Sequence, residues 1–161
     1  MVSVTLDTNL YNHRSLVERA VARSLSVAFT SVSDRELANA YQPVPAPRDV
    51  LETGVFGESE WGRAVWASDS DGEVLEQVLR VVSSGSVPRN CEPGELPAGL
   101  RNHLRDAIAL CAHFRERRDI FVSDDTKAFV SHGRREILEA LLGTRIMSTA
   151  EFSEWLENQP S

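Results

Sequence analysis

The sequence has no long apolar run and no apolar leader, and each absence excludes a class of protein. No stretch of 18 apolar residues exists, so no segment is predicted to span a membrane. The first 25 residues carry charged side chains where a signal peptide would have its apolar core. We therefore expect a cytoplasmic protein with no membrane association.

The spacing of a thiolate or imidazole metal site is also missing. Cys91 and Cys111 form no CxxC pair, and the four histidines are scattered without HxxxH spacing. The formal net charge of −7 argues against a broadly basic surface for nucleic acid, although it allows a local basic strip. These absences leave the carboxylates as the side chains to examine for chemistry.

The length and composition are those of one globular domain. With 161 residues, of which 42% are hydrophobic and 25% charged, the chain can bury a core of its own. We expect a single domain over residues 1–161. It is interrupted by an irregular excursion at about 42–71, which holds three prolines, three glycines and two tryptophans.

Apolar strands and amphipathic helices alternate along the chain. The predicted strands are residues 2–6, 25–33, 120–125 and 144–147. The predicted helices are residues 10–22, a segment after Ser33 or Asp34, and residues 74–82, 100–118 and 133–143. A capping box of Ser148 and Glu151 begins a last helix. This alternation predicts a three-layer α/β/α sandwich with a twisted, mainly parallel sheet of about four to five strands.

Acidic residues follow two of the predicted strands directly. Asp7 comes after the first strand, and Asp124 and Asp125 end the apolar run at 120–125. Ligands of parallel sheets bind beyond the carboxyl ends of the strands, so we expect these acids at one edge. Glu36, at the first turn of the helix after the second strand, and Asp106, early in the helix before residue 120, are predicted to reach the same edge.

Carboxylates gathered within a few ångströms of one another need a cation. They repel and raise one another's pKa unless a positive charge neutralises them. Mg²⁺ and Mn²⁺ prefer oxygen ligands, and such a site can activate water and hold a phosphate. The acidic set therefore predicts hydrolysis of phosphodiester bonds.

Each acid also has a structural interpretation when it is taken alone. Glu36 suits a helix N-terminus as a solvated residue, and Asp106 suits an ordinary surface position. Asp7 and Asp125 could cap turns at the strand ends. The joint pattern, rather than any one residue, favours the metal site.

Four short segments carry a resemblance to a known family. LDTNL, SDREL, LRDAIAL and FVSDDTKAF resemble the four acidic motifs of the PIN domain, in the same order and on matching elements. The resemblance implies a Mg²⁺- or Mn²⁺-dependent ribonuclease fold, found as the toxin subunit of bacterial toxin–antitoxin pairs and in RNA-processing nucleases. It also implies RNA as substrate, an antitoxin protein as a partner of the toxin type, and a homodimer.

The resemblance assigns roles residue by residue. Asp7, Glu36, Asp106 and an acid of the 124–125 pair would hold the metal and act in catalysis, with Asp125 favoured because it lies two residues after Ser123. Asp124 is kept as a second candidate ligand. Thr8, Asn9 and Ser123 would support the site through hydrogen bonds. The long stretch between Glu36 and Asp106 departs from the compact toxin pattern.

Two other functions fit part of the same pattern. A catalytically inactive PIN-like module would bind RNA or protein and keep the acids without using them. A Mg²⁺-dependent phosphatase of the haloacid dehalogenase type also uses an acid after its first strand, but it needs a second acid two residues later, where this chain has Asn9.

The basic and aromatic residues give weaker signals. Two groups of arginines, residues 115–118 and 134–135, could flank an RNA backbone, but local pairing with Glu116 and Glu136 is the better interpretation. Trp61 and Trp66 could stack on bases, although tryptophan more often anchors a core. Trp155, in the last helix, is predicted to pack.

Overall fold

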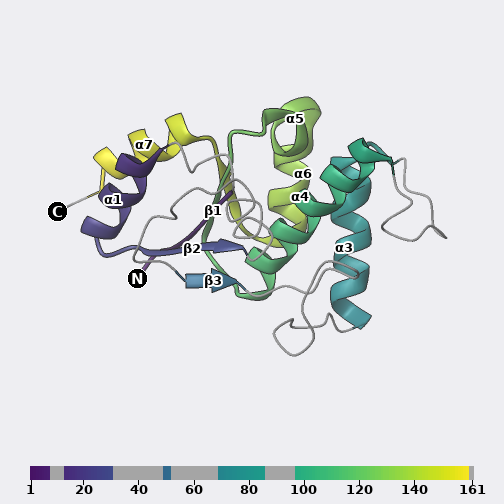
Figure 1. The fold of residues 1–161 in the computed structure, drawn as a ribbon, viewed down its shortest axis with the longest axis horizontal. Coiled ribbons are helices and arrows are strands. Elements are labelled where there is room, and N and C mark those ends of the chain that lie inside the picture. Colours follow the sequence, from purple (N-terminus) through teal and green to yellow (C-terminus); the bar gives the residue numbers. More distant parts are fainter. Residues whose placement is uncertain (8–12, 31–48, 52–68, 86–96, 160–161) are drawn as a thin grey trace.

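The computed structural model describes residues 1–7, 13–30, 49–51, 69–85 and 97–159 (Figure 1). The strands are β1 (Ser3–Leu6), β2 (Ser26–Thr30), β3 (Asp49–Leu51), β4 (Ile120–Val122) and β5 (Arg145–Met147). The helices are α1 (Arg14–Ala22), α3 (Asp69–Val82), α4 (Ala98–Arg115), α5 (Thr126–Phe129), the 3₁₀ turn η3 (Ser131–Gly133), α6 (Arg134–Leu142) and α7 (Thr149–Glu157).

The strands form one parallel sheet in the order β3-β2-β1-β4-β5. β1 is central, with Leu6 level with Phe29 of β2 and with Val122 of β4. The predicted fold class is confirmed. β3 lies inside the stretch expected to be an excursion, and most of the rest of that stretch, Trp61 and Trp66 included, falls outside the described residues.

Side chains alternate between two cores along the strands, as parallel strands covered on both faces require. Val4, Leu6 and Val122 face α1 and α7, whereas Phe121 and Ile146 face α3, α4 and α6. Figure 1 shows α1 and α7 together on one side of the sheet and α3, α4 and α6 on the other. Trp155 of α7 packs on the first core and stacks on Phe152, as predicted.

Some predicted ends differ because local backbone contacts stop the elements early. β4 ends at Val122 rather than at residue 125, because the chain turns there into the short helix α5, which the sequence did not predict. α4 ends at Arg115 rather than at residue 118, because Arg117 adopts a left-handed φ of 49° that a helix cannot continue through. α6 ends as predicted, with Gly143 left-handed at its C-cap.

The last helix begins where the sequence placed it. The Ser148 side chain accepts a hydrogen bond from the Glu151 backbone N–H, and the Glu151 carboxylate accepts one in return from the Ser148 N–H at 2.8 Å. None of the helices within the described ranges is long and apolar enough to cross a bilayer.

α4 is held on the sheet by a buried histidine. His113 is fully buried; its Nδ1 lies 2.8 Å from Thr5 Oγ1, and its Nε2 lies 2.5 Å from Thr144 Oγ1. Burial, and next the nearby Arg118 guanidinium, lower the pKa of His113 to about 4. The ring is therefore neutral near pH 7, with one nitrogen donating and the other accepting.

The amino edge of the sheet is tied by the residues that follow α4. Arg118 donates to the backbone carbonyls of Val4 and Ser26, and the Asp119 carboxylate accepts from the Ser3 backbone N–H and hydroxyl at 2.8 and 2.7 Å. The hydrogen bonds from Ser3 lower the pKa of Asp119. Arg118 therefore serves the fold, and it is not part of a free basic flank.

The low pKa of His113 makes stability depend on pH. Because the pKa is about 4 in the folded chain and 6.5 when unperturbed, the unfolded state binds this proton first as the pH falls. The contribution of His113 to the free energy of unfolding is complete above pH 6.5. It is lost between pH 6.5 and 4, a change of about 3 kcal/mol.

Urea unfolding at several pH values measures this dependence. His113→Asn should remove most of the slope between pH 6.5 and 5, above the range in which Glu151 contributes, and His132→Asn, a change at an exposed ring, should keep it. An unchanged slope in His113→Asn would assign the pH dependence to another group.

Candidate functional site

The carboxyl ends of β1 and β4 meet at the point where the order of the sheet reverses. The chain adds β2 and β3 on one side of β1, then returns to add β4 and β5 on the other. Parallel sheets bind ligands at such a switch point, in the crevice beyond the strand ends. The two acidic segments expected at one edge, Asp7 and Ser123–Asp125, leave the sheet here.

A serine hydroxyl joins the two strand ends. Ser123 is fully buried, and its Oγ donates to Asp7 Oδ2 at 2.6 Å. The same oxygen accepts from the Asp125 backbone N–H at 3.0 Å. The Asp7 backbone N–H extends the β1–β4 pairing by donating to the Val122 carbonyl at 3.0 Å. The Asp7 carboxylate is thus held in a fixed orientation next to the backbone of Asp125.

Asp125 caps a helix with one carboxylate oxygen and lies at the carboxyl edge of the sheet. Its Oδ1 accepts from the Ala128 backbone N–H at 2.8 Å and so caps α5. Its second oxygen, Oδ2, has no hydrogen-bond partner among the residues that the structure describes. The turn-capping interpretation therefore holds for one oxygen of this carboxylate, while the other remains for a ligand.

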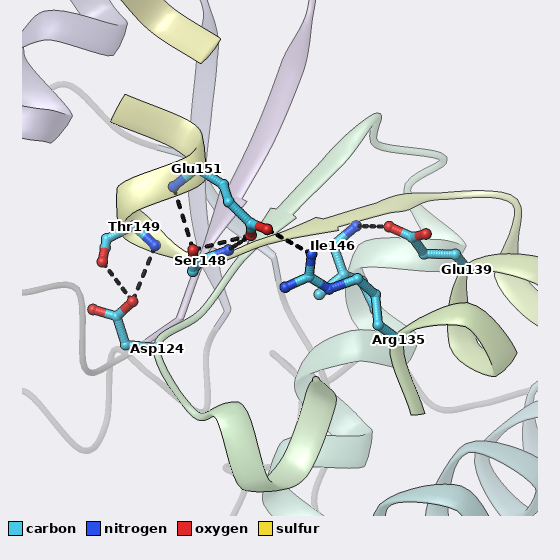
Figure 2. Close-up of polar contacts among 7 residues, drawn as sticks. All are labelled: Asp124, Arg135, Glu139, Ile146, Ser148, Thr149 and Glu151. Carbon is cyan, nitrogen blue, oxygen red and sulfur yellow. Dashed lines mark hydrogen bonds and ion pairs between the residues drawn. The ribbon is translucent and has the colours of Figure 1, made fainter. Parts of the chain in front are cut away.

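The Asp124 side chain contacts the first residue of α7. Its Oδ1 accepts from the Thr149 backbone N–H at 3.0 Å and from the Thr149 hydroxyl at 2.5 Å (Figure 2). Its Oδ2 lies 3.5 Å from His13 Nε2. The two adjacent acids therefore have different surroundings, and Asp125 is the one whose backbone contacts the Ser123 hydroxyl that holds Asp7.

The same region is braced by an ion pair between α6 and α7. Arg135 donates to Glu151 at 2.7 Å, and Glu139 accepts from the Ile146 backbone N–H at 2.7 Å (Figure 2). The hydrogen bond from Arg135, followed by those from Ser148, lowers the pKa of Glu151 to about 2. Arg135 is thus paired within the fold, although with Glu151 rather than with the expected Glu136.

Asp106 lies on the helix face that meets the sheet. It precedes His113 by seven residues, which is two turns of α4, or about 10 Å, along nearly the same face. His113 contacts Thr5, and Asp7 lies two residues, about 7 Å, further along the chain on the same face of the sheet. Since the residues after α4 are tied to the amino edge, both acids lie toward the carboxyl edge. The Asp106 side chain is 23% exposed, and its Oδ2 is 3.9 Å from His103 Nδ1.

The described acids do not by themselves complete a metal centre. Glu36, Thr8 and Asn9 lie outside the described residues, so the structure places none of them. Within the described ranges, no three side chains from His, Cys, Asp and Glu group closely enough to hold a metal ion. The carboxylate oxygens of Asp7 and Asp125 are nevertheless hard donors of the kind that suits Mg²⁺ or Mn²⁺.

Sequence reasoning missed residues that hold the helices and acids in place. No pattern marked His113, because its partners Thr5 and Thr144 are far away in the chain and are ordinary threonines. Thr149 was likewise not singled out, although its place as the first residue of a capped helix puts its N–H within reach of a nearby acid.

Comparison of the sequence with models of protein families finds no match, and comparison with curated proteins finds none either. The function is therefore inferred from the fold, the geometry of this edge and the order of the acidic motifs.

Proposed function

We propose that this protein is a Mg²⁺- or Mn²⁺-dependent endoribonuclease with a PIN-like fold. The observation that carries the proposal is the Ser123 hydroxyl, which holds the Asp7 carboxylate beside Asp125 where the order of the sheet reverses. The order of the four acidic motifs along the chain supports the same assignment. The proposal includes an RNA substrate, an antitoxin partner and a homodimer, as the resemblance implies.

Each residue has a defined part in the proposed reaction. Asp7, Glu36, Asp106 and Asp125 would hold the cation, and Asp124 would remain a subsidiary ligand beside Thr149. A bound cation would supply an activated water and offset charge on the phosphate. Ser123 orients Asp7, and the capped Oδ1 of Asp125 fixes the direction of its other oxygen. A carboxylate that is not occupied by metal would assist proton transfer.

Metal binding can be tested without substrate. At a Mn²⁺ concentration tenfold above its Kd, binding to the folded state adds about 1.4 kcal/mol. For a chain of this length that corresponds to a rise of about 3–6 °C in Tm. Asp7→Asn and Asp106→Asn should abolish the rise, as measured by differential scanning fluorimetry.

A control variant tests whether the rise in Tm comes from these particular acids or from the overall negative charge of the chain. Glu154→Gln removes one negative charge from the exposed surface of α7, and it should keep the full Mn²⁺-dependent rise. An equal rise in wild type and all three variants would rule out these acids as ligands.

Cleavage tests the activity itself. Wild type with Mn²⁺ should cut single-stranded RNA, and EDTA should stop it. Because Ser123 only positions Asp7, Ser123→Ala should lower the cleavage rate by about 10–100-fold, while Asp7→Asn should lower it further. The rate is measured by gel electrophoresis of end-labelled RNA.

Two results would favour the other functions. Mn²⁺-dependent stabilisation with no cleavage would identify an inactive module that binds metal. Hydrolysis of a phosphate monoester such as p-nitrophenyl phosphate, without RNA cleavage, would identify the phosphatase.

A further inference from the structure

A second candidate site lies between the end of α3 and the start of α6. A pocket of about 370 Å³ is lined by Val81, Ser84, His132, Arg134 and Ile137. We propose that this pocket, called here the α3–α6 pocket, binds one nucleotide unit through its phosphate. None of the described residues that line it carries a carboxylate, which suits an anion better than a metal ion.

Arg134 supplies the positive charge of the pocket. Its guanidinium donates to Ser84 Oγ at 2.6 Å and to the backbone carbonyl of Lys127, both of which are uncharged acceptors. Arg134 has no carboxylate partner within the described part of the chain, whereas the neighbouring Arg135 is paired with Glu151. Among the described residues no ion pair neutralises the charge of Arg134, and a guanidinium is a preferred partner of phosphate.

Two other polar side chains line the same pocket. Ser84 Oγ accepts from Arg134, so its own O–H is left to donate to a ligand. The exposed His132 ring is a further lining group, on a residue whose φ is 61°. The three side chains can together offer several donors to the oxygens of one phosphate.

Two of the residues that line the pocket are apolar. Ile137 is 53% exposed, and apart from Met1 no other large hydrophobic side chain within the described ranges is as open to solvent. Val81, which is half-buried, also lines the pocket. An inorganic phosphate would leave these side chains without a contact, whereas the ribose or base of a nucleotide would cover them.

The size of the pocket limits the ligand to a single unit. Ligand pockets range from about 300 to 1,000 Å³, and this one lies near the lower end of the range. The ligand can be a free nucleotide or one nucleotide of an RNA strand, since both present the same phosphate and ring. The RNA source rests on the proposed function, while the free nucleotide does not.

Titration of the full chain with AMP in EDTA tests the proposal, because the absence of metal prevents cleavage. Two-dimensional NMR of backbone amides should show shifts at residues of the pocket, Ser84, His132 and Arg134 among them. Arg134→Met, which keeps an apolar stem, should weaken AMP binding by about tenfold or more. Arg23→Met, a change at an exposed arginine beyond the end of α1, should leave the affinity unchanged.

A second variant leaves the hydrogen bonds of Arg134 within the fold in place. Ile137→Gln alters only an exposed side chain, and it should weaken AMP but leave the affinity for inorganic phosphate unchanged. Competition by AMP against a fluorescent RNA, measured by anisotropy, would identify RNA as a source, and AMP binding without competition would identify a free nucleotide.

The proposal is overturned if AMP at millimolar concentration shifts no amide of the pocket, or if Arg134→Met and Ile137→Gln both bind AMP as wild type does. Because metal is absent, this result is independent of whether Asp7 and Asp125 support cleavage.

Discussion

The hydrogen bond from Ser123 to Asp7 is the interaction on which the candidate site depends. Asp7 ends the central strand and Ser123 follows the neighbouring one, 116 residues later in the chain. This buried hydroxyl donates to the Asp7 carboxylate and accepts from the Asp125 N–H, so it fixes both groups without adding a charge. The pairing of β1 with β4, rather than any local motif, thereby brings the Asp7 carboxylate near the backbone of Asp125.

The position of α4 is fixed by hydrogen bonds toward the amino edge of the sheet. Arg118 holds the segment after α4 against the starts of β1 and β2, and the neutral ring of His113 joins the helix to Thr5 and Thr144. With these two points fixed, the helical repeat determines where Asp106 lies. A buried imidazole serves this purpose because it can donate and accept at once, and its low pKa keeps it uncharged in a site where a charge would be costly.

Features set by local sequence could be predicted, and features set by distant partners could not. Periodicity located the core elements, and Ser148, Glu151 and Gly143 marked helix ends because caps act within four residues. The role of His113 and the separation of Asp124 from Asp125 depend on Thr5, Thr144 and Thr149, which no spacing rule connects to them. Glu36 remains a prediction, because it lies outside the described residues.

In two pairs of adjacent, like-charged residues, one residue supports the fold and the other belongs to a proposed binding site. Asp124 accepts hydrogen bonds from Thr149, while one carboxylate oxygen of Asp125 has no partner in the described part of the chain. Arg135 is paired with Glu151, while Arg134 contacts only uncharged acceptors there. In each pair one residue, Asp124 or Arg135, contacts the first turn of α7. The two proposed sites would let an acidic chain hold a phosphate-bearing ligand, because the affinity would come from a bound cation and from the Arg134 guanidinium rather than from net charge.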